Sequence, residues 1–200
     1  ILSDKGWVRT LKGHQDDLAK LEFKQGDELK RAIKASTTDK LVVFATNGKF
    51  FTLEVGQLPG GRGHGEPVRL MVDLEENHDI AEIFVYEPGR KLLVASTGGY
   101  GFIVPEDEVI ASTRKGKQIL NVTEPEEARV CVPVDGDHVA TMGENRKMLV
   151  FKLDEVNEMT RGKGVILQRF KDGALSDVRV FKKSNGLTWL DSAGREFTLS

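Results

Sequence analysis

Apolar residues along the chain come in short runs that are separated by glycine, asparagine, aspartate and proline. Residues 41–44 and 92–94 are typical of these runs. Short apolar runs bounded by turn-forming residues indicate β-strands, whereas an amphipathic helix would show a period near 3.6 residues. Only residues 15–21 carry a helical pattern, and we expect a brief helical turn there. The pattern therefore predicts an all-β fold.

The predicted strands recur as hairpins with a period near fifty residues. Each repeat contains an apolar strand, a tight turn with glycine and a second apolar or aromatic strand, with turn glycines at Gly6, Gly48, Gly98, Gly143 and Gly194. Glycine supplies the positive φ that such connections favour. A second marker, an acidic residue followed by an apolar one, opens a further strand in the same phase at Glu28-Leu29, Asp79-Ile80, Glu127-Ala128 and Asp177-Val178.

This period predicts a propeller-like toroid. Repeats of roughly 40 to 50 residues with about four strands each are typical of propellers, and closure of the ring removes exposed strand edges. We expect a single domain over residues 1–200 with five blades. The fifth blade is either incomplete or completed by the first strands of the chain. No repeat ends in Trp-Asp, which disfavours the WD-repeat propeller.

Composition excludes several classes of protein. No apolar run is long enough to span a membrane. Cys131 is the only cysteine, so the chain has no disulfide framework, and we expect a reducing cytoplasm and a buried strand thiol. The chain begins at Ile1 without a signal-peptide pattern, which favours a piece of a longer protein. A formal net charge of −2 does not by itself favour nucleic acid, because most nucleic-acid-binding domains carry a basic excess.

The basic residues are nevertheless concentrated in glycine-bearing segments that recur with the repeat. Residues 9–14, 60–64, 113–117 and 160–164 hold eight Lys and Arg residues and no acidic ones. Equivalent segments of a closed ring would lie along one rim, where Lys and Arg gain from counterion release on DNA phosphates. Glycine beside the cation lets backbone N–H groups approach a phosphate. The plain alternative is that these are solvated surface turns.

Several stretches resemble the gyrase A C-terminal domain family, and within it the C-terminal domain of the topoisomerase IV A subunit. The stretches cover nearly the whole chain in order: residues 2–9 with Lys12-Gly13-His14, Arg62-Gly63 with Gly65-Glu66-Pro67, residues 91–96 leading to Gly99-Tyr100-Gly101-Phe102, and Lys163-Gly164. The resemblance implies a β-pinwheel, a propeller relative whose blades exchange strands and whose rim binds duplex DNA.

The resemblance also implies what surrounds this domain. The fragment itself is expected to be non-catalytic and to bind no cofactor, and the cutting tyrosine, ATP and Mg²⁺ belong to other parts of the enzyme. Its expected partners are double-stranded DNA, the ATPase subunit of topoisomerase IV, and the catalytic core of the same subunit. The implied role is to position a duplex for relaxation and decatenation in the bacterial cytoplasm, at the chromosome.

One motif bears on the choice within the family. The gyrase A protein carries a Gln-Arg-Arg-Gly-Gly-Lys-Gly box that is needed to wrap DNA. Residues 57–63 (Gln-Leu-Pro-Gly-Gly-Arg-Gly) keep the glutamine, the glycines and one cation, but Leu58 and Pro59 replace the paired arginines. This departure favours topoisomerase IV, with a gyrase wrapping domain as the alternative. A propeller that serves only as a protein-docking platform is the alternative from another class.

The remaining chemistry-bearing residues indicate no catalytic or metal site. The four histidines show no ligand spacing with one another or with Cys131, and no Gly-Lys-Ser/Thr follows the glycines at 60–65. Trp7 and Tyr100 could stack on bases but are more typical of blade packing. The predicted DNA-binding residues are Lys5, Arg9, Lys12, His14, Arg62, His64, Arg114, Lys115, Lys117, Arg161 and Lys163.

Overall fold

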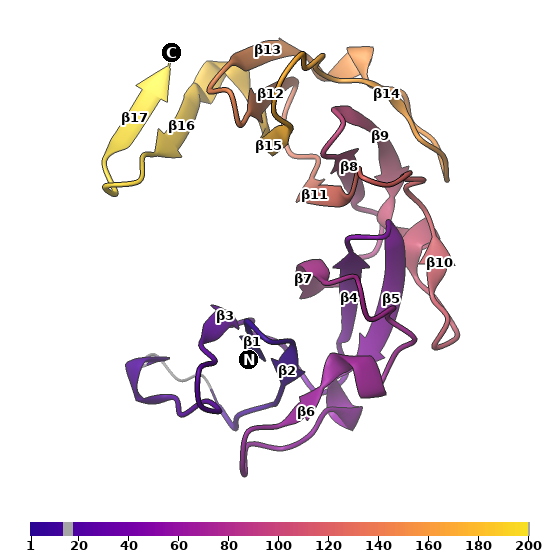
Figure 1. Cartoon of the computed structure of the whole chain (residues 1–200), viewed down its shortest axis with the longest axis vertical. Coiled ribbons are helices and arrows are strands. Elements are labelled where there is room, and N and C mark those ends of the chain that lie inside the picture. The colour runs from indigo at the N-terminus through magenta and orange to yellow at the C-terminus, as the bar shows by residue number, and fades with distance from the viewer. Residues whose placement is uncertain (14–17, 200) are drawn as a thin grey trace. The chain divides into compact units, whose positions relative to one another are not determined.

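The computed structural model describes residues 1–13 and 18–199, which form antiparallel sheets joined by short 3-10 turns (Figure 1). The all-β prediction is confirmed. The expected helical turn at residues 15–21 falls partly outside the described residues, and the described part contains η1 (Leu18–Lys20). The chain divides into two compact units, the first of residues 1–88 and 109–119 and the second of residues 89–108 and 120–200.

The first unit contains two four-stranded sheets. One has the order β3-β1-β2-β6 and the other the order β10-β5-β4-β7. The strands of the first sheet are β1 (Leu2–Ser3), β2 (Trp7–Val8), β3 (Leu29–Arg31) and β6 (Glu66–Pro67). Those of the second are β4 (Lys40–Ala45), β5 (Lys49–Glu54), β7 (Ile80–Val85) and β10 (Lys117–Gln118). The 3-10 turns are η2 (Val55–Gln57) and η3 (Val68–Leu70).

The second unit contains sheets of four, three and two strands, in the orders β11-β8-β9-β14, β13-β12-β15 and β16-β17. The four-stranded sheet is built from β8 (Lys91–Ser96), β9 (Tyr100–Pro105), β11 (Ala128–Pro133) and β14 (Val165–Ile166). The other two hold β12 (His138–Gly143), β13 (Met148–Lys152), β15 (Leu175–Phe181), β16 (Leu187–Leu190) and β17 (Glu196–Leu199). The 3-10 turns are η4 (Glu106–Val109, which opens in this unit), η5 (Leu153–Glu155) and η6 (Lys183–Asn185).

The five predicted hairpins are present, and the same turn closes each of them. In every turn a residue with positive φ donates its backbone N–H to the carbonyl three residues earlier, at Gly6, Gly48, Gly99, Arg146 and Gly194. The expected positive φ lies on another residue in two turns. It is at Gly99, next to the predicted turn glycine Gly98, and at Arg146, whereas the predicted turn glycine Gly143 directly precedes its turn. Gly143 instead ends strand β12. The corrected positions are 42, 51, 47 and 48 residues apart.

The acidic marker also has a structural role. Strands β3, β7 and β11 begin directly after Glu28, Asp79 and Glu127. At the last two positions the backbone N–H of the acidic residue donates to the hydroxyl of a threonine in the hairpin turn, Asp79 to Thr46 and Glu127 to Thr97, at 3.1 and 3.0 Å. In these two sheets the marker joins the third strand to its hairpin turn. The fourth predicted marker is wrong, because Asp177 lies inside β15 (Leu175–Phe181) and does not open it.

In three sheets the fourth strand comes from the following repeat. β6, β10 and β14 lie after η2, η4 and η5 in sequence and pair back onto β2, β5 and β9. Each of these exchanged strands begins after a glycine with positive φ: Gly65, Gly116 and Gly164. A Cβ on any of the three would lie 2.1 to 2.5 Å from a carbonyl oxygen of the accepting strand. An aliphatic residue with at most 4% exposure then follows each strand, namely Val68, Ile119 or Leu167.

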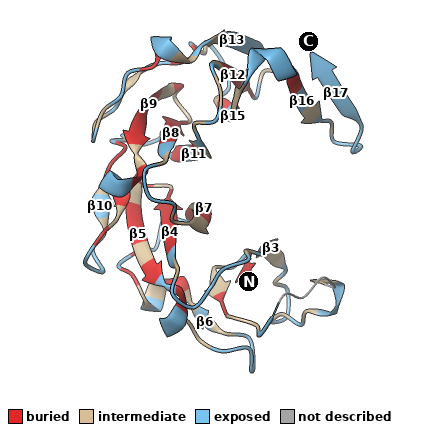
Figure 2. Ribbon diagram, turned by 180° about the vertical axis from the view of Figure 1, so that it is seen from behind, coloured by how far each residue is buried: buried red, intermediate tan, exposed pale blue. Residues whose placement is uncertain are grey.

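Each unit has its own hydrophobic core. Buried residues outnumber exposed ones in the strands β4, β5, β8 and β9, whereas β13 and β17 are largely exposed (Figure 2). Phe44 and Phe50 stack at a centroid distance of 4.6 Å in the first unit. Cys131 is buried in β11, as predicted. The β16–β17 hairpin pairs only within itself among the described residues.

Candidate nucleic-acid interface

Three of the four predicted basic segments lie in equivalent connections. Residues 60–64, 113–117 and 160–164 lead from a 3-10 turn into the exchanged strands β6, β10 and β14. In each connection the residue directly before the left-handed glycine is basic, namely His64, Lys115 or Lys163. We call these three connections the exchange loops. Each loop is anchored where its glycine contacts the accepting strand, so the backbone that carries the basic side chains is held in place.

The fourth basic segment, at residues 9–14, lies at a different position in its repeat. It starts three residues after its left-handed turn residue, whereas the exchange loops start 12 to 14 residues after theirs. It follows the two-residue strand β2 directly, and the next strand, β3, pairs with β1 of the same sheet. The segment instead lies against the first exchange loop, where the Thr10 N–H donates to the Pro59 carbonyl at 2.8 Å.

Arg9 holds these two segments together. Its side chain is 7% exposed, and its guanidinium donates to the carbonyl of Gly63 and, at 2.7 Å, to the carbonyl of Glu22. Lys12, Arg62 and His64 are exposed nearby, and His64 lines a small cavity with Trp7. His14 lies outside the described residues. The first sheet thus presents exposed basic side chains on a loop that a buried arginine fixes.

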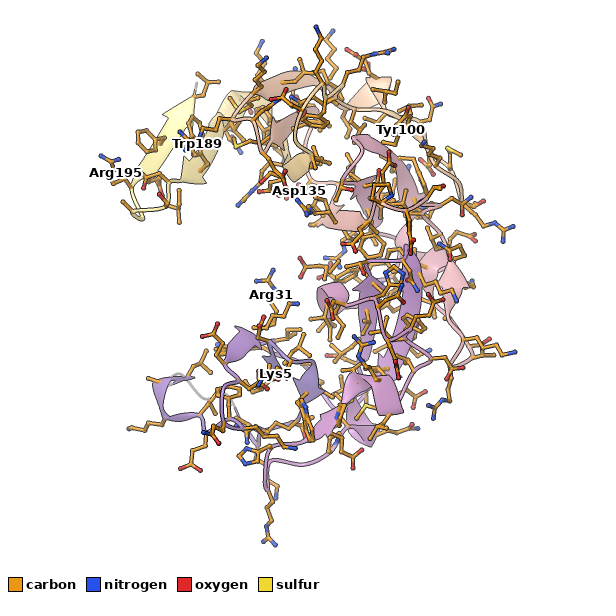
Figure 3. The ribbon with its side chains drawn as sticks, viewed as in Figure 1. Lys5, Arg31, Tyr100, Asp135, Trp189 and Arg195 are labelled. Carbon is orange, nitrogen blue, oxygen red and sulfur yellow. The ribbon has the colours of Figure 1, made fainter. Side chains whose placement is uncertain are left out.

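Lys5 lies in the β1–β2 turn of the same sheet and is exposed (Figure 3). Its backbone N–H donates to Asp27 Oδ1 at 2.9 Å, and its Nζ contacts the Gln25 carbonyl at 3.4 Å. Desolvation raises the pKa of Asp27, but hydrogen bonds from the Ser3 hydroxyl and from the N–H groups of Lys5 and Glu28 outweigh it. The pKa of Asp27 is therefore lowered. The negative charge of its carboxylate partly offsets the positive charge of Lys5.

The second exchange loop carries three exposed cations. The side chain of Arg114 is 61% exposed, with Nη2 donating to the Leu70 carbonyl at 2.8 Å and Nε 3.5 Å from Asp73 Oδ1. Its carbonyl accepts the Asp73 N–H at 2.9 Å, so backbone and side chain both tie the loop to the end of η3. Lys115 and Lys117 are exposed on either side of Gly116.

The third exchange loop presents Arg161 and Lys163, which are both exposed. Lys163 Nζ lies 4.1 Å from the centroid of the Tyr100 ring, at the start of β9 (Figure 3). Gly164 then packs its backbone against the Gly101 carbonyl. This loop therefore combines a long lysine side chain with an anchored backbone and an aromatic surface.

The exchange register gives a second alignment of the family box on this chain. Gly164 and Gly116 are the structural equivalents of Gly65, not of Gly63. A box that ends at Gly65 begins at Pro59 and places Gly60 and Gly61 where the paired arginines would lie, with His64 in place of the lysine. In either register the two arginines are missing.

Sequence reasoning missed one recurrent position. The residue directly after the left-handed turn residue is Trp7, Lys49, Tyr100, Lys147 or Arg195. It went unnoticed because two of the five turn residues were misassigned, so the position did not align. The contact of Lys24 with Trp7 was also missed. Lys24 Nζ lies 3.4 Å from the Trp7 ring centroid, and no motif in the sequence indicates this pairing.

The described residues contain no group of three or more His, Cys, Asp and Glu side chains arranged to hold a metal ion. In the same part of the chain, no helix has the length and apolar character required to cross a bilayer.

Comparison with known proteins identifies the family. The model of the DNA gyrase C-terminal domain, a β-propeller, matches residues 39–87, 90–130 and 137–182. The chain belongs to the DNA gyrase C-terminal domain family. A curated relative, the A subunit of DNA topoisomerase 4 from Caulobacter vibrioides, is 48% identical over 98% of the chain. The chain spans 26% of the length of that relative.

Solved members of the family share the fold. The Escherichia coli ParC C-terminal domain superposes with a TM-score of 0.85 at 25% identity, covering 99% of this chain and 84% of that one. A DNA gyrase A C-terminal domain gives a TM-score of 0.64 at 16% identity, covering 94% of this chain and 65% of that one, and that likeness shows the fold alone. The strand exchange described above is thus the β-pinwheel arrangement of this family.

Proposed function

We propose that the chain is the DNA-binding C-terminal domain of the A subunit of a topoisomerase IV and that all 200 residues act as this one domain. The observation that carries the proposal is the equivalence of the exchange loops, each of which presents exposed cations beside an anchored glycine. Such loops suit the phosphate backbone of a duplex, which gives affinity without sequence readout. The near-neutral net charge of −2 is compatible with this role because the cations are local.

We further propose that the domain works as part of a larger enzyme. In this proposal the ATPase subunit of topoisomerase IV and the catalytic core of the same subunit carry the cutting tyrosine, ATP and Mg²⁺. The domain contributes a bound duplex segment for relaxation and decatenation at the bacterial chromosome in the cytoplasm. The 48% identity to the A subunit of DNA topoisomerase 4 supports this assignment.

The test is a salt titration of duplex binding by the chain and by a variant of the second exchange loop. Replacing Arg114, Lys115 and Lys117 together by Ala should weaken binding at low salt. Each lost phosphate contact should also reduce the log–log salt slope by about 0.9. Fluorescence anisotropy with two unrelated duplex sequences measures both quantities and shows whether sequence matters.

The matched control replaces Arg179, Lys182 and Lys183, which are exposed cations of the same number and type outside the exchange loops. This variant should bind as the unaltered chain does. Equal losses in both variants would indicate diffuse attraction and sink the loop assignment. No salt-dependent binding by the unaltered chain would favour a protein-docking platform instead, for which the exposed apolar residues of β13 would be the first surface to test.

A further inference from the structure

The position directly after each left-handed turn residue carries a repeated function in the fold. It opens the second strand in three hairpins and directly precedes that strand in the other two, at Lys147 and Arg195. In the first three it pairs with the second residue of the exchanged strand: Trp7 with Pro67, Lys49 with Gln118 and Tyr100 with Ile166. This pairing places it beside the exchange loop of its own sheet. We call it the strand-opening position. Its side chain is cationic in three repeats and aromatic in two.

Both aromatic side chains at this position have a lysine ammonium over the ring. Lys24 Nζ is 3.4 Å from the Trp7 centroid, and Lys163 Nζ is 4.1 Å from the Tyr100 centroid. The electron-rich face of an aromatic ring attracts a cation. Every strand-opening position therefore presents a positive charge, either its own or one held on its ring.

The Tyr100–Lys163 pair shows how the ring could serve DNA binding. The residue after Lys163 is locked, because Gly164 has a φ of +86° and a Cβ there would lie 2.1 Å from the Gly101 carbonyl oxygen. The backbone of Lys163 is thus fixed, and the ring restricts the end of its side chain. No ion pair joins Lys163 to a carboxylate within the described part of the chain. An ammonium has three donors, so one face can rest on the ring while N–H groups bind a phosphate.

We propose that Tyr100 is a positioning residue that holds Lys163 over its ring for contact with a DNA phosphate, and that Trp7 does the same for Lys24. This inference rests on the proposed DNA-binding function and assigns the two aromatic residues a part in it. A lysine that is already restricted loses less side-chain entropy when it binds. The rings thus raise affinity without adding charge.

A double-mutant cycle with duplex DNA tests the Tyr100–Lys163 pair in the full chain. Tyr100→Leu keeps an apolar side chain but removes the ring, and we expect its Kd for duplex to rise about two- to tenfold, the entropic cost of ordering one long side chain. The log–log salt slope should stay unchanged, since the charge of Lys163 remains. Tyr100→Phe keeps the ring face and should bind as the unaltered chain does. Lys163→Ala should reduce the salt slope by about 0.9.

The decisive comparison is Tyr100→Leu in the Lys163→Ala background, where we expect no further loss. An equal loss in both backgrounds, or none in either, would overturn the inference while leaving the proposed function intact. Absence of salt-dependent binding by the unaltered chain would instead remove the proposed function. The midpoint of thermal unfolding of each variant separates a misfolded protein from a weaker binder, and Trp7→Leu with Lys24→Ala repeats the cycle in the first sheet.

Discussion

At the scale of single residues, Glu106 is fully buried and depends on Arg90. Its carboxylate accepts hydrogen bonds from Arg90 Nε at 2.5 Å and from Nη2 at 3.1 Å, and its backbone N–H donates to the Arg90 carbonyl at 2.8 Å. Removing one partner of a buried ion pair is costly, because the remaining charge loses a close counter-charge in a medium of low polarity. The pair therefore fixes the start of η4, from which the chain continues toward the second exchange loop.

We expect Arg90→Ala to lower the free energy of unfolding by about 3 kcal/mol or more. Chemical denaturation at neutral pH measures the loss. The matched control is Lys91→Ala, which breaks an ion pair with Glu158 at 2.7 Å whose side chains are about half exposed. That change should cost less than about 1 kcal/mol. Similar losses in the two variants would mean that burial does not decide the contribution of these ion pairs.

At the scale of elements, the exchanged strands depend on one glycine each. Gly164 has positive φ, and its backbone touches the carbonyl of Gly101 on the accepting strand β9. Alanine at this position is disfavoured for two reasons. A residue with a Cβ rarely adopts this positive φ, and the Cβ would overlap the Gly101 carbonyl. β14 has only two residues, and the buried Leu167 that follows it donates its N–H to the Gly99 carbonyl at 2.7 Å.

We expect Gly164→Ala to detach β14 and to cost about 2 kcal/mol or more in unfolding free energy. Hydrogen exchange should rise at β14 and along β9, and duplex affinity should fall because the third exchange loop loses its anchor. The control is Gly60→Ala in the first exchange loop, where φ is not positive and a Cβ would have no neighbour within 4 Å. A Gly164→Ala variant with normal exchange protection would show that the glycine is dispensable.

The fourth sheet shows what an absent exchanged strand exposes. Within the described residues β13 pairs with β12 alone, and Met148, Leu149 and Val150 are 37 to 45% exposed. In β5 and β9, which accept exchanged strands, the buried residues outnumber the exposed ones. An unpaired apolar edge invites pairing with other chains. The exchange therefore protects sheet edges as well as positioning the exchange loops.

At the scale of the whole molecule, the repeat was the part of the fold that could be predicted from the sequence. Local patterns reveal hairpins, turns and the period, because each depends on residues close together in the chain. Strand exchange depends on pairs such as Ile166 with Tyr100, 66 residues apart, and it entered only through family resemblance. The burial of Arg9 also depends on residues distant in sequence. Its pattern in the sequence is that of a surface cation, but its guanidinium donates to the carbonyls of Gly63 and Glu22.

The candidate site was predictable to the level of loops but not of contacts. The basic segments stand out in the sequence, and three of them occupy equivalent connections. The sequence does not show which basic residue directly precedes the glycine that begins the exchanged strand. Two glycines have positive φ in each of two loops, Gly63 and Gly65 in the first and Gly162 and Gly164 in the third. Only the pairing of the exchanged strands shows that Gly65 and Gly164 correspond.

The second alignment of the box leads to a prediction about the path of bound DNA. If the gyrase box that the resemblance implies is aligned to end at Gly65, its two arginines and its lysine fall on Gly60, Gly61 and His64. With fewer permanent cations at this loop, less binding energy offsets the cost of bending a duplex, so we expect weak wrapping. Ligation of nicked circular DNA in the presence of the chain, followed by measurement of linking number, should show few constrained positive supercoils.

Restoring charge at this loop should strengthen wrapping. Gly60 can accept a side chain, whereas a Cβ on Gly61 would lie 2.9 Å from the Thr10 carbonyl oxygen, so a single arginine is the most the loop admits without rearrangement. We expect Gly60→Arg with His64→Lys to increase the salt slope by about 0.9 for each new phosphate contact and to constrain more positive supercoils. Gly60→Ala with His64→Ala controls for the loss of glycine and histidine. If affinity rises while linking number stays constant, the charge of this loop sets how tightly DNA is held but not how it bends, and the preference for topoisomerase IV over gyrase would need another structural basis.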